Sequence, residues 1–244
     1  MDLTNTTILI TGGGTGIGLS LAEALSKKGN RIVICGRREE KLREAKARIP
    51  SMEYSVTDLR KPNDLQALFE WTTNQFPDVG VLVNNAGIQQ MLDFSKPDSV
   101  KNPTAEIEAN LSAPIVLSSL FIRHFLRKEK SAIINVTSGL AFAPLAFLPV
   151  YCATKAAMHS FSLSLRHQLR NTTIRVFEAI PPTVDTDLDK GAREKRGQKD
   201  RGIPPSVVAQ EIIRGVEADE FEILIGMAKN LRESGDKMFF NMNK

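Results

Sequence analysis

Residues 7–18, which read TILITGGGTGIG, decide the fold. Residues 7–11 are mostly β-branched and predict a buried strand. A glycine-rich turn follows at once. A helical pattern then begins, with Leu21, Ala24 and Leu25 on its apolar side. A strand, a tight turn and a helix therefore succeed one another at the start of the chain.

The glycine-rich turn has the features of a phosphate cradle. Glycine lets the backbone turn sharply and lie close to a pyrophosphate, and the following helix N-terminus offers N–H groups to an anion. No Gly-Lys-Ser/Thr follows, which excludes the P-loop alternative. A tight turn that binds nothing is the other interpretation. The residues predicted to bind a dinucleotide here are Thr11, Gly12, Gly14, Thr15, Gly16, Ile17 and Gly18.

Short apolar runs alternate with helical patterns along the rest of the chain. Continuous Ile/Val runs predict strands buried on both faces, as in a parallel sheet covered by helices. We therefore expect an α/β, single-domain Rossmann fold over 1–244, with a doubly wound parallel sheet of about seven strands and helices on both faces. The predicted strands are 7–11, 31–35, 53–56, 79–84, 132–137, 174–178 and 222–225.

Composition excludes several classes of protein. The net charge of +4 forms no basic stripe, so we expect no nucleic-acid partner. Cys35 and Cys152 are far apart and fit reduced thiols, and the histidines have no metal-ligand spacing, so no metal is expected. No uninterrupted run is long enough to span a membrane, and the N-terminus lacks signal-peptide features. We expect a cytoplasmic protein without a membrane partner.

The end of the second predicted strand bears on the choice of cofactor. An NAD enzyme normally places a carboxylate there for the ribose 2′-hydroxyl, whereas this chain has Arg37 and Arg38, which suit a 2′-phosphate. This predicts NADP over NAD, with Arg37 the stronger candidate. The alternative is that both arginines start a solvated helix and pair with Glu39, Glu40 or Glu44.

Three residues in the second half form a candidate catalytic group. Ser138 follows a strand, Tyr151 comes later, and Lys155 lies one helical turn beyond Tyr151. A nearby ammonium stabilises a phenolate, so the pair can exchange a proton at neutral pH. Ser138 can hydrogen-bond a substrate oxygen. This predicts interconversion of a carbonyl and an alcohol with a nicotinamide cofactor.

With these motifs the chain resembles a classical short-chain dehydrogenase/reductase, from about Thr7 to Ile225. Thr11, Gly12, Gly16 and Gly18 match the family's glycine motif. The resemblance implies further cofactor contacts: Asn84, Asn85, Ala86 and Gly87 close the fourth strand beside the adenine, and Asp58 with Leu59 contacts the adenine.

The resemblance also implies a catalytic tetrad of Asn110, Ser138, Tyr151 and Lys155. In it Asn110 relays protons by holding a water beside Lys155, and Lys155 hydrogen-bonds the nicotinamide ribose. The family usually has Pro-Gly after the sixth strand, where this chain has Pro181-Pro182. Proline lacks an N–H, so the carboxamide loop is expected to differ, with Pro181, Thr183 or Thr186 as contacts.

Three segments resemble the DltE-type subgroup of that family: SGLAF at 138–142, YCATK at 151–155 and IPPTV at 180–184. Apolar residues between Ser138 and Tyr151 are expected to form a wall for an apolar substrate or, alternatively, to pack on the sheet. These are Leu140, Phe142, Leu145, Phe147 and Leu148.

Two further segments receive predictions. Residues 185–205 are expected to form a lid, whose charges at 193–196 and 199–201 either attract an anionic substrate or form a solvated face. The apolar tail, 227–244, packs on a partner subunit, as in the homodimers and homotetramers common in the family, or on its own body.

Three functions compete for this sequence. The first is an NAD(P)(H)-dependent oxidoreductase acting on a small ketone, aldehyde or alcohol. The second is a catalytically silent nucleotide-sensing or interaction protein, which would not need the Ser138, Tyr151 and Lys155 set. The third is a racemase or epimerase, which usually occurs in longer chains on related folds.

Overall fold

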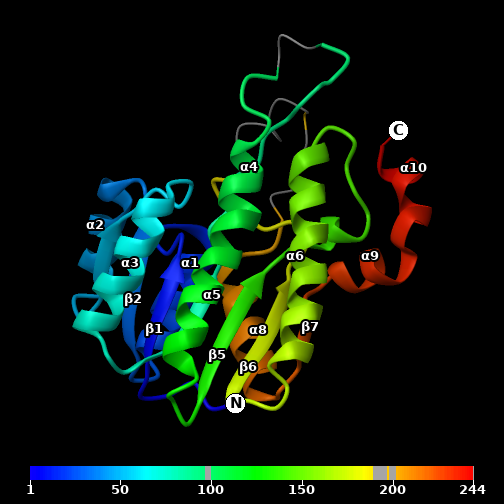
Figure 1. Cartoon of the computed structure of the whole chain (residues 1–244). Helices are drawn as coiled ribbons and strands as arrows, with labels where there is room; N and C mark the ends of the chain where they lie inside the picture. Colours follow the sequence, from blue (N-terminus) through cyan, green and yellow to red (C-terminus); the bar gives the residue numbers. More distant parts are fainter. Residues whose placement is uncertain (97–99, 189–196, 198–201, 244) are drawn as a thin grey trace.

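One parallel sheet of seven strands organises the chain, in the order β3-β2-β1-β4-β5-β6-β7 (Figure 1). The computed structural model describes residues 1–96, 100–188, 197 and 202–243. The strands are β1 (Thr7–Thr11), β2 (Arg31–Gly36), β3 (Glu53–Val56), β4 (Val79–Asn84), β5 (Ser131–Val136), β6 (Ile174–Ile180) and β7 (Glu222–Leu224). The strand order reverses between β1 and β4, which is where ligands bind in open α/β sheets.

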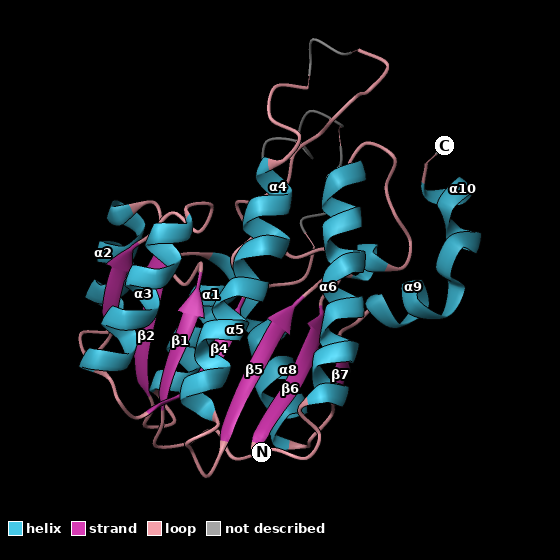
Figure 2. Cartoon of the chain, viewed as in Figure 1, coloured by secondary structure: helices cyan, strands magenta, loops and turns pink. Residues whose placement is uncertain are grey.

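Helices cover both faces of the sheet (Figure 2). Side chains alternate along each strand, so Ile8 and Ile10 pack in one apolar core and Leu9 packs in the other. The first core holds α1 (Gly16–Ser26), α2 (Glu39–Arg48) and α8 (Pro205–Glu217). The second holds α3 (Pro62–Gln75), α5 (Ala113–Phe125) and α6 (Pro149–Gln168). The predicted Rossmann fold is confirmed.

Several predicted element ends were wrong. The prediction ended β6 at the charged Glu178, but this side chain is fully buried and the strand continues to Ile180, which pairs with Leu224. Strand β5 begins and ends one residue earlier than predicted, β2 ends one residue later, and β7 ends one residue earlier. Helix α6 begins at Pro149, because proline in a first turn needs no N–H partner.

The helix that precedes β5 is long and apolar. It comprises α4 (Ala105–Ile107), a π-helical turn (Glu108–Ser112) and α5. By length and composition Ala105–Phe125 could cross a membrane, but 50% of its apolar window is buried inside the protein. Phe121 and Phe125 are fully buried in the second core. The apolar character of this helix is therefore explained by packing on the sheet.

The C-terminal segment lies beside the upper part of α6 (Figure 1). It comprises α9 (Ala228–Ser234), a 3₁₀ turn (Gly235–Met238) and α10 (Phe239–Met242). Asn243 donates to the carbonyl of Pro144 at 3.1 Å and accepts from the N–H of Ala146. The tail therefore packs on its own body, which was one of the two alternatives for it.

Candidate active site

A cavity with a volume of about 1180 Å³ lies at the carboxyl ends of the strands. One end is polar, with Arg37 and Asp58 in its wall. Ser138, Tyr151 and Lys155 line its middle, and apolar side chains line the far end. The cavity therefore joins the glycine turn, the candidate catalytic group and the predicted apolar wall.

The glycine turn forms a cradle that leaves no room for side chains. Gly12 has a φ of +66°, and a Cβ there would lie 2.9 Å from the Cα of Ala86. Gly16 has a φ of +55°, and a Cβ there would lie 2.9 Å from Thr186. Thr15, the N-cap of α1, makes no side-chain cap bond. The first N–H groups of α1 can therefore bind an anion at this end of the cavity.

Two residues of the glycine motif lie behind the cradle instead of in the cavity wall. The hydroxyl of Thr11 accepts the N–H groups of Asn85 and Ala86, both at 3.0 Å. A Cβ at Gly18 would lie 2.4 Å from the carbonyl oxygen of Gly12. Thr11 and Gly18 are absent from the lining of the cavity, and their predicted cofactor contact stays a prediction. They hold the loops together.

At the end of β4, too, some residues line the cavity and one lies behind its wall. Asn85, Ala86 and Gly87, for which cofactor contacts are predicted, line the cavity. Asn84 is buried behind the cavity wall and donates to Asn135 at 2.9 Å. Its amide links β4 to β5, an interaction that only the pairing of these strands creates.

The polar end of the cavity holds a carboxylate clamped by an arginine. Asp58 accepts from Arg60 at 2.6 and 3.0 Å, and this interaction lowers the pKa of Asp58 to about 2. Leu59 lies in the same wall, as predicted. Sequence reasoning missed Arg60, although its place two residues after Asp58 was a signal for such a clamp.

Cations gather around this end. Arg37, Arg38 and Lys41 line the cavity. Both arginines are exposed, and Arg38 donates to the hydroxyl of Thr15 at 3.3 Å. The alternative pairing with helix glutamates loses support, because Glu39 pairs with Arg43 and Glu44 pairs with Lys41. The two arginines can face an anionic group of a ligand.

Tyr151 and Lys155 lie one turn apart on α6, both buried in the cavity wall. The Lys155 Nζ is 5.6 Å from the centre of the Tyr151 ring. It also donates to the Val136 carbonyl at 2.9 Å, which fixes the amine at the end of β5. Burial lowers the pKa of Lys155 from 10.5 to about 8, although the nearby charge of Glu178 raises it in part.

Ser138 lies beside this pair at the end of β5. Its hydroxyl oxygen accepts from the N–H of Leu140 at 3.1 Å. A hydroxyl has one proton to donate, and this contact orients the oxygen without using that proton. Ser138 can therefore donate a hydrogen bond into the cavity.

Asn110 lies outside the cavity wall, although its neighbour Ala109 is part of that wall. Its amide accepts from the N–H of Ile88 and donates to the carbonyl of Ile88, both at 2.8 Å. The π-helical turn Glu108–Ser112 carries the side chain to this loop. Gly87 lies between Asn110 and Lys155, since a Cβ there would be 3.5 Å from the Asn110 Oδ1 and 3.8 Å from the lysine Nζ.

The loop after β6 contributes Pro181, Pro182, Thr183 and Thr186 to the cavity wall. The carbonyl of Pro181 accepts from the N–H of Gly139 at 2.9 Å, which joins this loop to the candidate catalytic serine. Thr186 packs against Gly16 at the cradle. Thr186 therefore lies at the cradle end of the cavity.

The apolar end includes Leu140, Leu145, Phe147 and Leu148, as predicted. The prediction for Phe142 was wrong, because its ring faces away from the cavity wall and packs on His159, with the ring centres 4.8 Å apart. Sequence reasoning missed four C-terminal residues in this wall, although the apolar tail had been noticed. These are Met227, Leu231, Met238 and Met242.

The predicted lid is described at its two stems and at residue 197. Val184 pairs with Ile203, and Asp185 donates its N–H to the Ile203 carbonyl at 3.0 Å. Leu188 and Gly202 line the cavity on either side of this bridge. The charged runs at 193–196 and 199–201 lie outside the described residues.

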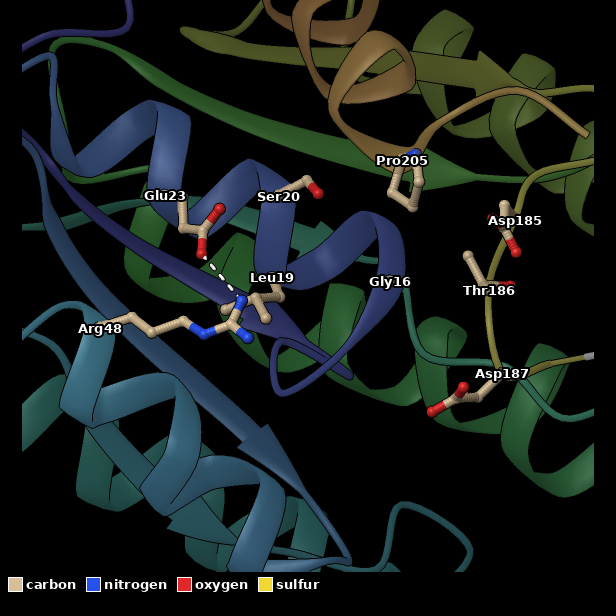
Figure 3. A pocket seen from close by; sticks show the side chains of 9 residues that line it. All are labelled: Gly16, Leu19, Ser20, Glu23, Arg48, Asp185, Thr186, Asp187 and Pro205. Carbon is tan, nitrogen blue, oxygen red and sulfur yellow. Dashed lines mark hydrogen bonds and ion pairs between the residues drawn. The ribbon is translucent and has the colours of Figure 1, made fainter.

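A second, smaller cavity of about 280 Å³ lies on the outer side of α1 (Figure 3). Gly16 and Thr186 lie between it and the main cavity. Arg48 reaches Glu23 across it at 3.4 Å, so its basic and acidic groups are partly paired. Over the described ranges, no group of three His, Cys, Asp or Glu side chains could hold a metal ion.

Comparison with known proteins identifies close relatives of this chain. The short chain dehydrogenase sequence pattern matches residues 6–197. DltE, an uncharacterized oxidoreductase of Bacillus subtilis (strain 168), is 46% identical over 248 residues, covering 100% of this chain and 98% of that protein.

Solved structures share the fold. A short chain dehydrogenase/reductase from Burkholderia phymatum in complex with NAD superposes with a TM-score of 0.86 at 20% identity, covering 95% of this chain and 93% of that one. A short-chain dehydrogenase from Sphingobium yanoikuyae in complex with NADPH gives 0.81 at 26% identity, covering 92% and 91%. These two proteins bind different cofactors, so the fold alone does not choose between them.

Proposed function

The chain belongs to the short-chain dehydrogenase family, in its DltE-like subgroup, and from that premise we propose a nicotinamide-dependent oxidoreductase that interconverts a carbonyl compound and an alcohol. One observation carries the proposal. Lys155 and Tyr151 lie one helical turn apart in the wall of the cavity that begins at the glycine cradle.

The cavity fits a nicotinamide dinucleotide. The cradle at Gly12 and Gly16 would accommodate the pyrophosphate, and the wall at Asp58 and Leu59 would hold the adenine. When bound, this cofactor supplies or accepts the hydride. We propose NADP over NAD, since Arg37 and Arg38 face the cavity where a 2′-phosphate would need a cation.

Tyr151 is the proposed acid and base. Its phenol gives a proton to the carbonyl oxygen during reduction and takes one from the alcohol during oxidation. The Lys155 ammonium, held by the Val136 carbonyl, favours the phenolate electrostatically. Ser138 donates a hydrogen bond to the same substrate oxygen and so helps to orient it.

Asn110 is proposed to act on the proton path through the loop that it holds. It fixes both polar backbone groups of Ile88, beside Gly87 and Lys155. A water between this loop and the Lys155 amine would return protons to Tyr151 from solvent. This is the relay role expected from the family.

The substrate is proposed to have an apolar body next to its carbonyl. Leu145, Phe147 and Leu148 line the far end of the cavity, so burying apolar atoms there is favourable. A silent nucleotide-binding protein remains the second candidate. The Ser138, Tyr151 and Lys155 set disfavours it, because binding alone requires no acid–base group.

We also propose a homodimer or homotetramer. Ile115 and Val116 on α5 and Leu163 on α6 are exposed apolar side chains, each between 37% and 40% accessible. Such side chains are commonly covered at subunit contacts. Light scattering after size exclusion measures the assembly directly.

The decisive experiment follows NADPH absorbance at 340 nm with a panel of aliphatic and aromatic ketones and aldehydes. We expect turnover by the wild type and a loss of about 10³-fold in Tyr151→Phe, in the range of general acid–base catalysis. Tyr54→Phe is the matched control, because Tyr54 lies on β3 outside the cavity wall. NADPH binding without turnover across the panel would favour the silent protein.

A further inference from the structure

A line of polar contacts runs from α9 into the core beside the candidate catalytic residues. The guanidinium of Arg232 donates to the Nε2 of His159 at 3.0 Å. The Nδ1 of His159 lies 2.8 Å from Glu178, which also accepts from Thr137 at 2.7 Å. The line thus joins the C-terminal segment to α6, β6 and the residue before Ser138.

The chemistry of this line fixes the state of its histidine. Arg232 can only donate, so the His159 Nε2 must accept, and the Nδ1–H must donate to the Glu178 carboxylate. Glu178 is fully buried, and the His159 side chain is 14% exposed. A buried carboxylate requires such partners, so the imidazole ring has a single favourable orientation.

Arg232 is fixed from two other sides. Its guanidinium lies 4.4 Å from the centre of the Phe142 ring and 3.3 Å from Glu222. Phe142 in turn packs edge-on against His159. These contacts explain why Phe142 faces away from the cavity: it completes the attachment of α9.

The rest of the C-terminal segment is fixed at two more points. A Cβ at Gly139, next to Ser138, would lie 2.7 Å from Leu231, so α9 packs directly on the serine loop. At the other end Asn243 is bonded to Pro144 and Ala146. Met238 and Met242 lie between these attachment points and line the apolar end of the cavity.

We propose that His159 and Arg232 are positioning residues that hold the C-terminal segment, 228–243, as a fixed wall of the substrate site. Met238 and Met242 on this wall accept the part of an apolar substrate most distant from its carbonyl. Methionine side chains adapt to many shapes, so selectivity depends on where the backbone that carries them is held. This inference rests on the proposed function.

Arg232→Met is the first test, because it removes the donor but keeps a long side chain against Phe142. Glu222 retains Arg166 at 3.6 Å, and His159 retains Glu178. We expect faster amide hydrogen exchange in peptides covering 227–243, with no change in β4 or β5. Arg214→Met is the matched control, since Arg214 forms ion pairs only with Glu211 and Glu220 among the described residues, on the surface of α8.

Kinetics test whether this wall selects substrates. Two ketones are compared with NADPH as the cofactor. The alkyl chain of 2-decanone is long enough to extend from the carbonyl site toward Met238 and Met242, whereas that of 2-butanone is not. For Arg232→Met we expect the apparent KM for 2-decanone to rise about tenfold and that for 2-butanone to change less than twofold. An equal change for both ketones would contradict the proposal, because the role would then be general.

Replacement of His159 separates positioning from a purely structural role. His159→Gln keeps one donor and one acceptor. This variant should therefore retain most of the wild-type ratio of the KM values for the two ketones. His159→Phe lacks both and should reproduce Arg232→Met. Hydrogen exchange unaltered at 227–243 in Arg232→Met would overturn the proposal. Absence of turnover in the wild type would instead count against the proposed function and leave the exchange result valid.

Discussion

The two ends of the main cavity are built on different principles. At the polar end the phosphate cradle is formed by backbone, with glycines at 12 and 16 approached so closely by Ala86 and Thr186 that a Cβ would collide with them, and the side chains of Arg37 and Asp58 lie beside it. The apolar end consists of side chains from three separate parts of the described chain: 140–148, the two stems at 184–188 and 202–203, and 227–242.

This difference teaches where specificity can vary. A backbone cradle binds the part of a ligand that is common to all dinucleotides, and side-chain changes hardly alter it. A wall of Leu, Phe and Met side chains can change shape by single substitutions at small cost. Lys155 lies where the two ends meet, with its amine bonded to β5 and beside the Tyr151 ring.

The largest effect is expected for Lys155→Met, which removes the amine that lies between the two ends of the cavity. Turnover should fall by about 10³-fold, since the phenol loses its stabilising charge. The free energy of unfolding at neutral pH should instead be higher in the variant than in the wild type. Burial lowers the Lys155 pKa from 10.5 to about 8, so folding opposes its charge below pH 8 and this penalty disappears as pH rises to 10.5.

Urea unfolding of wild type and Lys155→Met at pH 7, 9 and 10 measures this linkage. The free energy of unfolding of the wild type, relative to the variant, should increase with pH by up to about 3 kcal/mol. Lys130→Met, at an exposed position, is the control and should show no such trend. A difference that stays constant between pH 7 and 10 would contradict the assigned pKa.

Gly12→Ala tests the backbone end. The new Cβ would lie 2.9 Å from the Ala86 Cα at a φ of +66°, so we expect a loss of about 2–3 kcal/mol in stability and weaker binding of NADPH. Urea unfolding and fluorescence titration measure the two effects. Gly235→Ala is the control for the cofactor effect: it also has a positive φ, but no atom lies within 4 Å of a Cβ there, so NADPH binding should be unchanged.

Arg37→Ala tests whether the polar end selects its cofactor. Loss of a charge-assisted contact of about 2 kcal/mol would weaken NADP binding about 30-fold and leave NAD binding nearly unchanged. Calorimetric titration with both dinucleotides measures the ratio. Arg43→Ala, which removes a cation on α2 outside the cavity wall, should leave the ratio unchanged. Tighter binding of NAD than NADP by the wild type would refute the assignment.

Met238→Ala tests the side-chain end and should have the smallest effect. Removing part of an apolar contact of about 1 kcal/mol predicts a rise of about fivefold in the KM for 2-decanone, with NADPH binding unchanged. Steady-state kinetics at saturating NADPH measure it. Phe240→Ala is the control, since that ring is 78% exposed and outside the cavity wall. A similar change in NADPH affinity would show that the two ends are not separate.

The sequence by itself determined the fold and the spacing of the candidate catalytic pair. Both depend on local periodicity: β-branched runs form buried strands, and a separation of four residues puts Tyr151 and Lys155 on one face of a helix. The sequence also predicted the turn at Gly12 and Gly16, because a turn with no room for a Cβ requires glycine at those positions.

Only the tertiary structure decided which residues hold these parts in place. The predicted strand ended at Glu178, yet this side chain is buried by partners that lie 19 and 41 residues away, His159 and Thr137. The same holds for Met238 in the cavity wall and for Phe142 outside it. Phe142 packs on Arg232, which in turn contacts His159 on α6. Such contacts follow from how distant segments pack, and local propensity carries no information about that packing.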